Sequence, residues 1–69
     1  MRVRVAQAAA ADLRSALRQA GCVSVALGGG ELAIAYPLAA DFSEEAVTLL
    51  FFLRAWQAAR PTAKLEIRT

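Results

Sequence analysis

The sequence contains no histidine and only one cysteine, Cys22. Without histidine, the chain lacks the side chain that most often acts as a general base near neutral pH and that most often binds transition metals. A single cysteine cannot form a disulfide within the chain, so we expect its thiol to stay reduced, as in a cytoplasmic protein. These absences predict no catalytic site, no metal site and no cofactor.

Long apolar runs and a strong charge bias are also missing. The longest apolar run, Leu49–Leu53, is far shorter than a membrane-spanning helix, and Arg54 ends it. The start of the chain, Met1–Val5, alternates arginine with valine and therefore does not resemble a signal peptide. A net charge of +2 is too small to indicate nucleic-acid binding by itself. We expect one small cytoplasmic domain over residues 1–69.

Apolar side chains are abundant for a chain of 69 residues. Hydrophobic residues make up 58% of the sequence and charged residues 20%, so the apolar share is above that of most globular domains. A chain this short buries only a modest core. Small domains gain further stability from disulfides, metals or association, and only association is left here.

The sequence pattern predicts six elements of secondary structure. Alternation of apolar and polar residues predicts strands at 2–5, 22–27, 31–36 and 64–68. Helix-forming residues with helical periodicity predict a helix over 6–20 and a second helix that begins within 41–45 and ends at Arg60. Gly28–Gly30 is a hairpin turn between two strands, and Asp41 and Ser43 are both candidates for the N-cap of the second helix.

The order β-α-β-β-α-β predicts an α+β fold, a two-layer split βαβ (ferredoxin-like) sandwich. In this arrangement a four-stranded antiparallel sheet has two helices on one face, and fold analogy gives the strand order 4-1-3-2. ACT regulatory domains, metallochaperones and acylphosphatases share the order of elements, but the chain has no residue motif of any of them. Fold analogy alone does not license a function.

Alternation along each strand assigns side chains to the two faces of the sheet. We expect the following residues to face the helices: Val3, Val5, Val23, Val25, Leu27, Leu32, Ile34, Tyr36, Leu65 and Ile67. We expect these residues to lie on the open face: Arg2, Arg4, Cys22, Ser24, Ala26, Glu31, Ala33, Ala35, Lys64, Glu66 and Arg68.

The second helix is apolar around most of its circumference, whereas a surface helix normally has a polar side. This pattern predicts a non-enzymatic protein-association module, a homo-oligomer or the binder of a protein partner. The predicted interface consists of Val47, Phe51, Phe52 and Ala55 on the helix and of Ala26, Ala33 and Ala35 on the open sheet face. In the simpler alternative, loop residues such as Leu38 and Phe42 cover the helix, and the alanines merely contact water.

Two further functions are alternatives. Four basic residues, Arg2, Arg4, Lys64 and Arg68, are expected on one sheet face and would suit nucleic acid or another polyanion. That face has no stacking aromatic residue, and Glu66 lies among the basic groups, so a solvated charged face explains the same pattern. Fold analogy alone supports the second alternative, a small-ligand regulatory domain with a pocket between subunits.

Two other features have simple structural explanations. Cys22 has no histidine or second cysteine to pair with, so we expect it to behave as a small apolar residue. The carboxylates of Asp41, Glu44 and Glu45 cluster as metal ligands sometimes do, but helix capping accounts for them.

Overall fold

The computed structural model of the chain describes residues 1–68. In chain order the elements are β1 (Arg2–Arg4), the 3₁₀ turn η1 (Gln7–Ala9), α1 (Ala10–Gln19), β2 (Val23–Gly28), β3 (Glu31–Ala35), α2 (Phe42–Ala59), the 3₁₀ turn η2 (Pro61–Ala63) and β4 (Glu66–Arg68). All six predicted helices and strands are present. The first helix begins four residues later than predicted, because residues 7–9 form the 3₁₀ turn.

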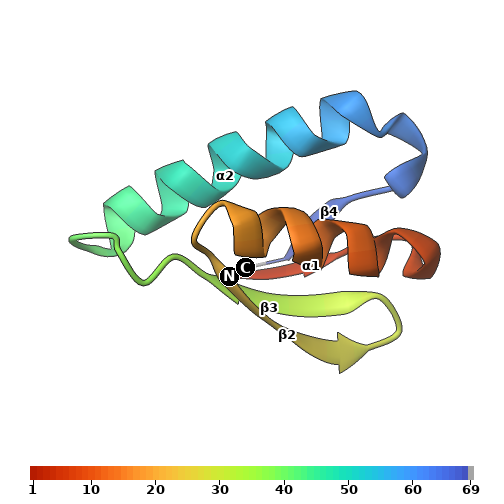
Figure 1. Ribbon diagram of the computed structural model, residues 1–69, viewed down its shortest axis with the longest axis horizontal. Helices are drawn as coiled ribbons and strands as arrows, with labels where there is room; N and C mark the ends of the chain where they lie inside the picture. Colours follow the sequence, from red (N-terminus) through yellow and green to blue (C-terminus); the bar gives the residue numbers. More distant parts are fainter. Residues whose placement is uncertain (69) are drawn as a thin grey trace.

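The four strands form one antiparallel sheet in the order β2-β3-β1-β4. Counted from β4, this order is 4-1-3-2, as fold analogy indicated. Both helices cover the same face of the sheet (Figure 1), because Leu13 of α1 and Leu53 of α2 belong to one core cluster with Val3 of β1. The predicted α+β class, with an antiparallel four-stranded sheet and two helices, is therefore confirmed.

The core is small and contains only apolar side chains within residues 1–68. Its buried members are Val3, Val5, Leu13, Leu17, Cys22, Leu32, Ile34, Leu49, Leu53, Trp56 and Ala63. Tyr36, Leu65 and Ile67 pack against this cluster and are partly buried, in agreement with the predicted core face. No polar or charged side chain in the described chain is buried, so the side chains of the core interact by apolar packing.

The faces of β2 are the reverse of those predicted. Val23, Val25 and Leu27 are exposed, although alternation assigned them to the core. Cys22 is buried instead, and it was expected on the open face.

A single extra residue explains this reversal. Ala26 lies opposite Leu32 and Gly28 lies opposite Glu31, so Leu27 is an unpaired bulge in β2. If the two strands paired without the bulge and Gly28 stayed opposite Glu31, Leu27 would lie opposite Leu32. The valines of β2 would then face the helices. Because side chains alternate along a strand, a shift of one residue moves every side chain of β2 to the other face.

Asp41 is the N-cap of α2. Its Oδ1 accepts a hydrogen bond from the backbone N–H of Glu44 at 2.8 Å. The Glu44 carboxylate in turn accepts from the N–H of Ala40 at 3.1 Å. This reciprocal arrangement satisfies donors at the start of the helix and decides between the two candidate caps, Asp41 and Ser43.

Removal of this cap gives a direct test of the start of α2. We expect Asp41→Ala to lower the free energy of unfolding by about 1 kcal/mol, because it leaves the N–H of Glu44 without its partner. Ser43→Ala is the matched control and should change it by less than about 0.5 kcal/mol. Urea denaturation followed by circular dichroism measures both values, and a larger loss for Ser43→Ala would contradict the assignment.

Candidate functional site

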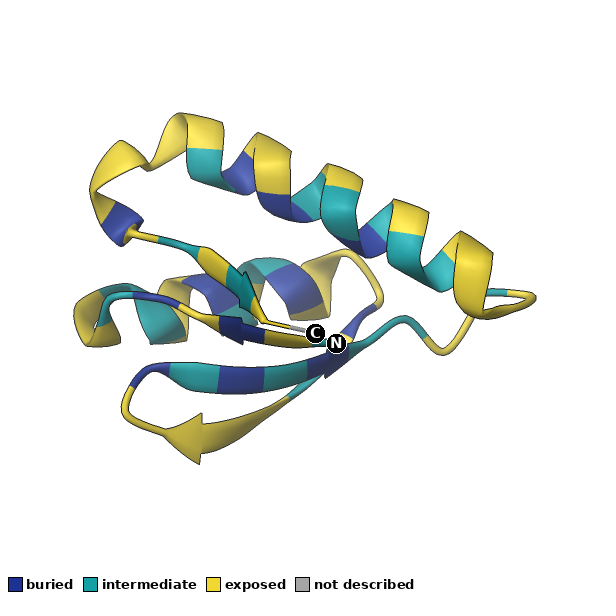
Figure 2. Cartoon of the chain, turned by 180° about the vertical axis from the view of Figure 1, so that it is seen from behind, coloured by how far each residue is buried: buried dark blue, intermediate teal, exposed yellow. Residues whose placement is uncertain are grey.

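Apart from Phe42 in the first turn, the large exposed apolar side chains of α2 lie on one side of the helix. Phe51 is 78% exposed and Val47 66% exposed, and Ala55 and Ala58 are exposed as well. Their spacing of three and four residues places them in one row, which we call the outer face of α2. Figure 2 shows the exposed outer side of α2 opposite the buried side that packs on the sheet.

Phe51 and Phe52 have different environments, although both were predicted at the interface. Phe52 is half-buried and packs against the core cluster. Adjacent residues of a helix point about 100° apart, so one phenylalanine turns toward the core while the other faces outward. Of the predicted helix residues, only Val47, Phe51 and Ala55 share the outer face.

Loop residues do not cover the outer face of α2. Leu38 is 75% exposed and Phe42 is 89% exposed, so neither is packed over the helix. The alternative in which these residues shield the helix is therefore wrong. Phe51 keeps most of its surface in contact with water within the described chain.

The sheet residues predicted at the interface are divided between the two faces. Ala33 and Ala35 are half-buried on the open face, where they lie opposite Val25 and Val23 of β2. Ala26 lies opposite Leu32, on the face that carries the helices, so its assignment to the open face was wrong. The bulge that reverses β2 thus replaces a flat alanine surface by exposed valines.

The four basic residues do not form an uninterrupted positive patch. Arg4 lies between Glu31 of β3 and Glu66 of β4 in the register of the sheet. Arg68 Nε lies 3.9 Å from Glu31 Oε2. Lys64 lies outside the sheet, in a left-handed conformation with φ 55° before β4. Carboxylates therefore lie beside Arg4 and Arg68 on this face, which weakens its attraction for a polyanion.

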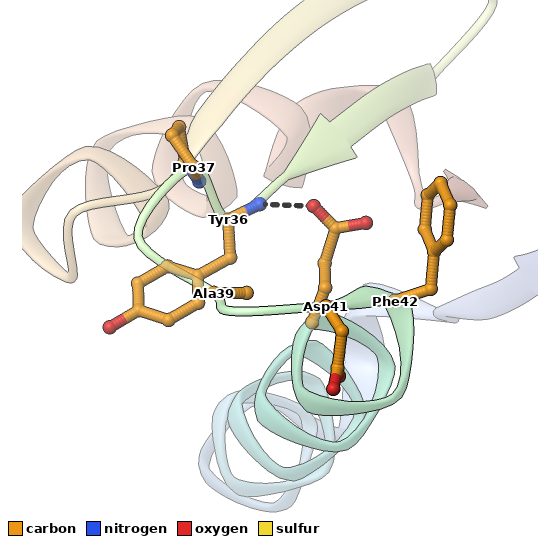
Figure 3. A pocket seen from close by; sticks show the side chains of 6 residues that line it. Tyr36, Pro37, Ala39, Asp41 and Phe42 are labelled. Carbon is orange, nitrogen blue, oxygen red and sulfur yellow. Dashed lines mark hydrogen bonds between the residues drawn. The ribbon is translucent and has the colours of Figure 1, made fainter.

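A depression of about 310 Å³ lies where the loop after β3 meets α2 (Figure 3), and its lining includes Tyr36, Asp41 and Glu45. Both carboxylates there have structural partners. Glu45 accepts a hydrogen bond from the backbone N–H of Tyr36 at 3.0 Å, and Asp41 caps the helix. Residues 1–68 contain no group of three or more side chains suited to a metal ion. The depression is a helix–loop junction and holds no acid–base pair.

Cys22 is buried, with 6% of its surface exposed. Burial raises the pKa of the Cys22 thiol, and the negative charge of Glu45 raises this pKa further. Because the thiolate is the nucleophilic form of cysteine, both effects make the side chain unreactive at neutral pH. Cys22 belongs to the core cluster, as a small apolar residue would.

The chain matches no protein-family model, no curated protein and no solved structure. None of the helices within residues 1–68 combines the length and the apolar character needed to cross a membrane.

The burial of Cys22 predicts slow thiol chemistry. We expect iodoacetamide to alkylate the folded protein at least about tenfold more slowly than the urea-unfolded protein. The pKa of the Cys22 thiol is raised in the folded state, so this thiol ionises first in the unfolded chain as the pH increases. The folded state therefore loses stability from about pH 8.5 upward. Cys22→Ala should flatten this part of the stability profile. Equal alkylation rates in the folded and unfolded states would contradict the burial.

Proposed function

We propose that the chain is a non-enzymatic protein-association module that forms a homodimer through the outer face of α2. The observation that carries the proposal is Phe51, which is 78% exposed in the middle of an apolar row. Burying such a side chain stabilises a complex by roughly 1.5–3 kcal/mol. A dimer buries two of them, one from each copy.

The sequence of the outer face suits antiparallel packing about a twofold axis at Phe51. In that arrangement, residues equally far before and after Phe51 face each other across the axis. Val47 of one copy then faces Ala55 of the other, which pairs a large side chain with a small one. Phe51 meets its own counterpart, where two aromatic rings can stack or meet edge to face.

Charge along α2 favours the same arrangement. Glu44 lies in the first turn and Arg54 lies in the second half of the helix. Antiparallel packing brings Glu44 of one copy within about 6 Å, along the helix axis, of Arg54 of the other. Parallel packing would instead place like charges side by side, which is unfavourable. A second copy is thus a complementary partner for this surface.

The size of the surface predicts a weak dimer. The 18 residues of α2 extend about 27 Å, and one helix face buries less than the roughly 800 Å² per partner that is usual for a stable complex. We expect association in the micromolar to millimolar range, so that the dimer responds to the concentration of the protein.

Further parts of the proposal concern fold and location. The strand order and the shared helix face support a ferredoxin-like split βαβ fold. The absence of histidine and the buried thiol of Cys22 support a role without catalysis. A lone cysteine also suits the reducing conditions of the cytoplasm.

Removal of the central aromatic ring tests the dimer. We expect Phe51→Ser to weaken self-association by at least about a hundredfold, because two buried rings are lost. Phe42→Ser is the matched control: Phe42 is 89% exposed but lies about 180° around the helix from Phe51. Sedimentation equilibrium over a range of concentrations measures both. A wild-type protein that stays monomeric up to about 1 mM would overturn the proposal.

Exchange of the charges tests the orientation of the helices. We expect Arg54→Glu to weaken the dimer several-fold, because it places a negative charge near Glu44 of the other copy. Glu44→Arg in the same chain should restore much of the lost affinity. Sedimentation in low and high salt measures the effect, with circular dichroism to confirm that each variant is folded. A double variant no tighter than Arg54→Glu alone would exclude antiparallel packing.

A further inference from the structure

We propose that the free edge of β2 accepts an extended segment of a partner protein as a fifth strand, and that this segment carries carboxylates facing Arg14 and Arg18. The proposal does not depend on the α2 dimer, because it uses other residues and another kind of contact. Addition of a strand to a sheet edge gives affinity through backbone hydrogen bonds and specificity through alternate side chains.

The two edges of the sheet differ in how well they are protected. β4 has three residues, and two of them, Glu66 and Arg68, are charged and exposed. β2 has six residues and carries no charged side chain. Edge strands usually avoid pairing with other chains through short length and charge. Only the β2 edge lacks both protections.

Hydrogen bonds in the middle of the sheet fix the direction of the backbone groups. Met1 and Ile34 exchange two backbone bonds, of 3.0 and 2.8 Å, so the peptide groups of Ile34 point toward β1. Successive residues of an antiparallel strand point to opposite sides. The N–H and C=O groups of Ala33 and Ala35 therefore point toward β2.

The same alternation identifies the unpaired groups of β2. Val23 and Val25 lie opposite the two alanines and bond to them. The N–H and C=O groups of Ser24 and Ala26 then point away from the sheet. They supply two donors and two acceptors in the positions that an incoming strand requires.

Arginine side chains line the helix side of this edge. A depression of about 200 Å³ is lined by Arg14, Arg18, Cys22, Val23 and Ser24, with no acidic residue among them. Arg14 Nε donates a hydrogen bond to Ser24 Oγ at 3.3 Å, which holds the guanidinium beside the strand. The ion pairs of residues 1–68 are Arg60–Asp12 and Arg68–Glu31, so neither Arg14 nor Arg18 is paired with a carboxylate there.

The open-face side of the edge is apolar. Val23 and Val25 are 52% and 61% exposed and would pack against apolar side chains of an added strand. An added strand presents alternate side chains to the two faces of the sheet. The complementary segment therefore alternates apolar residues with glutamate or aspartate.

A second copy of the chain fits this edge poorly. Pairing of β2 with β2 in an antiparallel manner would bring Arg14 and Arg18 of both copies to the same side of the new sheet. Four positive charges would then gather where the chain supplies no carboxylate. An acidic segment neutralises the arginines and is the partner that the charges favour.

A synthetic peptide gives a direct test. The probe is an acetylated and amidated peptide of about eight residues in which valine alternates with glutamate, and the control peptide has lysine in place of glutamate. We expect the glutamate peptide to bind at least about tenfold more tightly, with an affinity that falls as salt increases. Binding should slow hydrogen exchange of the Ser24 and Ala26 amides, measured by NMR on the Phe51→Ser variant.

Variants separate the backbone contact from the charge contact. The Ala26 N–H points away from the sheet, so Ala26→Pro removes this donor without breaking a hydrogen bond to β3. We expect Ala26→Pro to abolish binding of the glutamate peptide and Ala26→Ser to retain it. Arg14→Gln with Arg18→Gln should remove the preference for glutamate over lysine. The control is Arg2→Gln with Arg4→Gln, which removes two positive charges from the open face. This double variant should still prefer the glutamate peptide over the lysine peptide.

Three outcomes would overturn the proposal. The first is the absence of slowed exchange at Ser24 and Ala26 with the glutamate peptide in excess. The second is equal binding of the glutamate and lysine peptides. The third is protection of these amides in the free protein that disappears on dilution, which would show that a second copy occupies the edge.

Discussion

A two-layer sandwich has one interior, so an apolar side chain on the outer side of either layer stays in contact with water. Within residues 1–68, eleven buried apolar residues fill the interior. Phe51 and Val47 lie on the outer side of the helix layer, and Val23 and Val25 lie on the outer side of the sheet. The excess of apolar residues in the sequence therefore appears as exposed surface, and both proposed contacts follow from that constraint.

The bulge at Leu27 decides what the sheet presents at its exposed edge. It turns the valines of β2 outward and places Ser24 and Ala26 on the helix side. Small side chains there leave room for Arg14 to reach Ser24 and to remain beside the strand. The result is an edge with an apolar side and a positively charged side. Such a pattern discriminates among partner segments by the alternation of their side chains.

The two proposed contacts depend on different forces. Packing of α2 against a second copy depends on the burial of Phe51 and is broadly non-directional, with charge selecting the orientation. Pairing at β2 depends on backbone hydrogen bonds, which require an extended partner in register. The contacts use separate elements, so occupation of one does not remove the groups of the other. In both cases the charged side chains that take part form no ion pair within residues 1–68.

The sequence by itself determined the order of the elements, the antiparallel sheet, the covered face and the apolar excess of α2, because these follow from local periodicity and composition. It also predicted exposure of Val47, Phe51, Phe52 and Ala55, of which Phe52 is half-buried against the core. Only the tertiary structure decided the face of β2 and the burial of Cys22, since one unpaired residue in a glycine-rich hairpin changes the register without changing the alternation. Likewise, the pairing of Arg4 and Arg68 with carboxylates, and the availability of Arg14 and Arg18, depend on which strands and helices become neighbours.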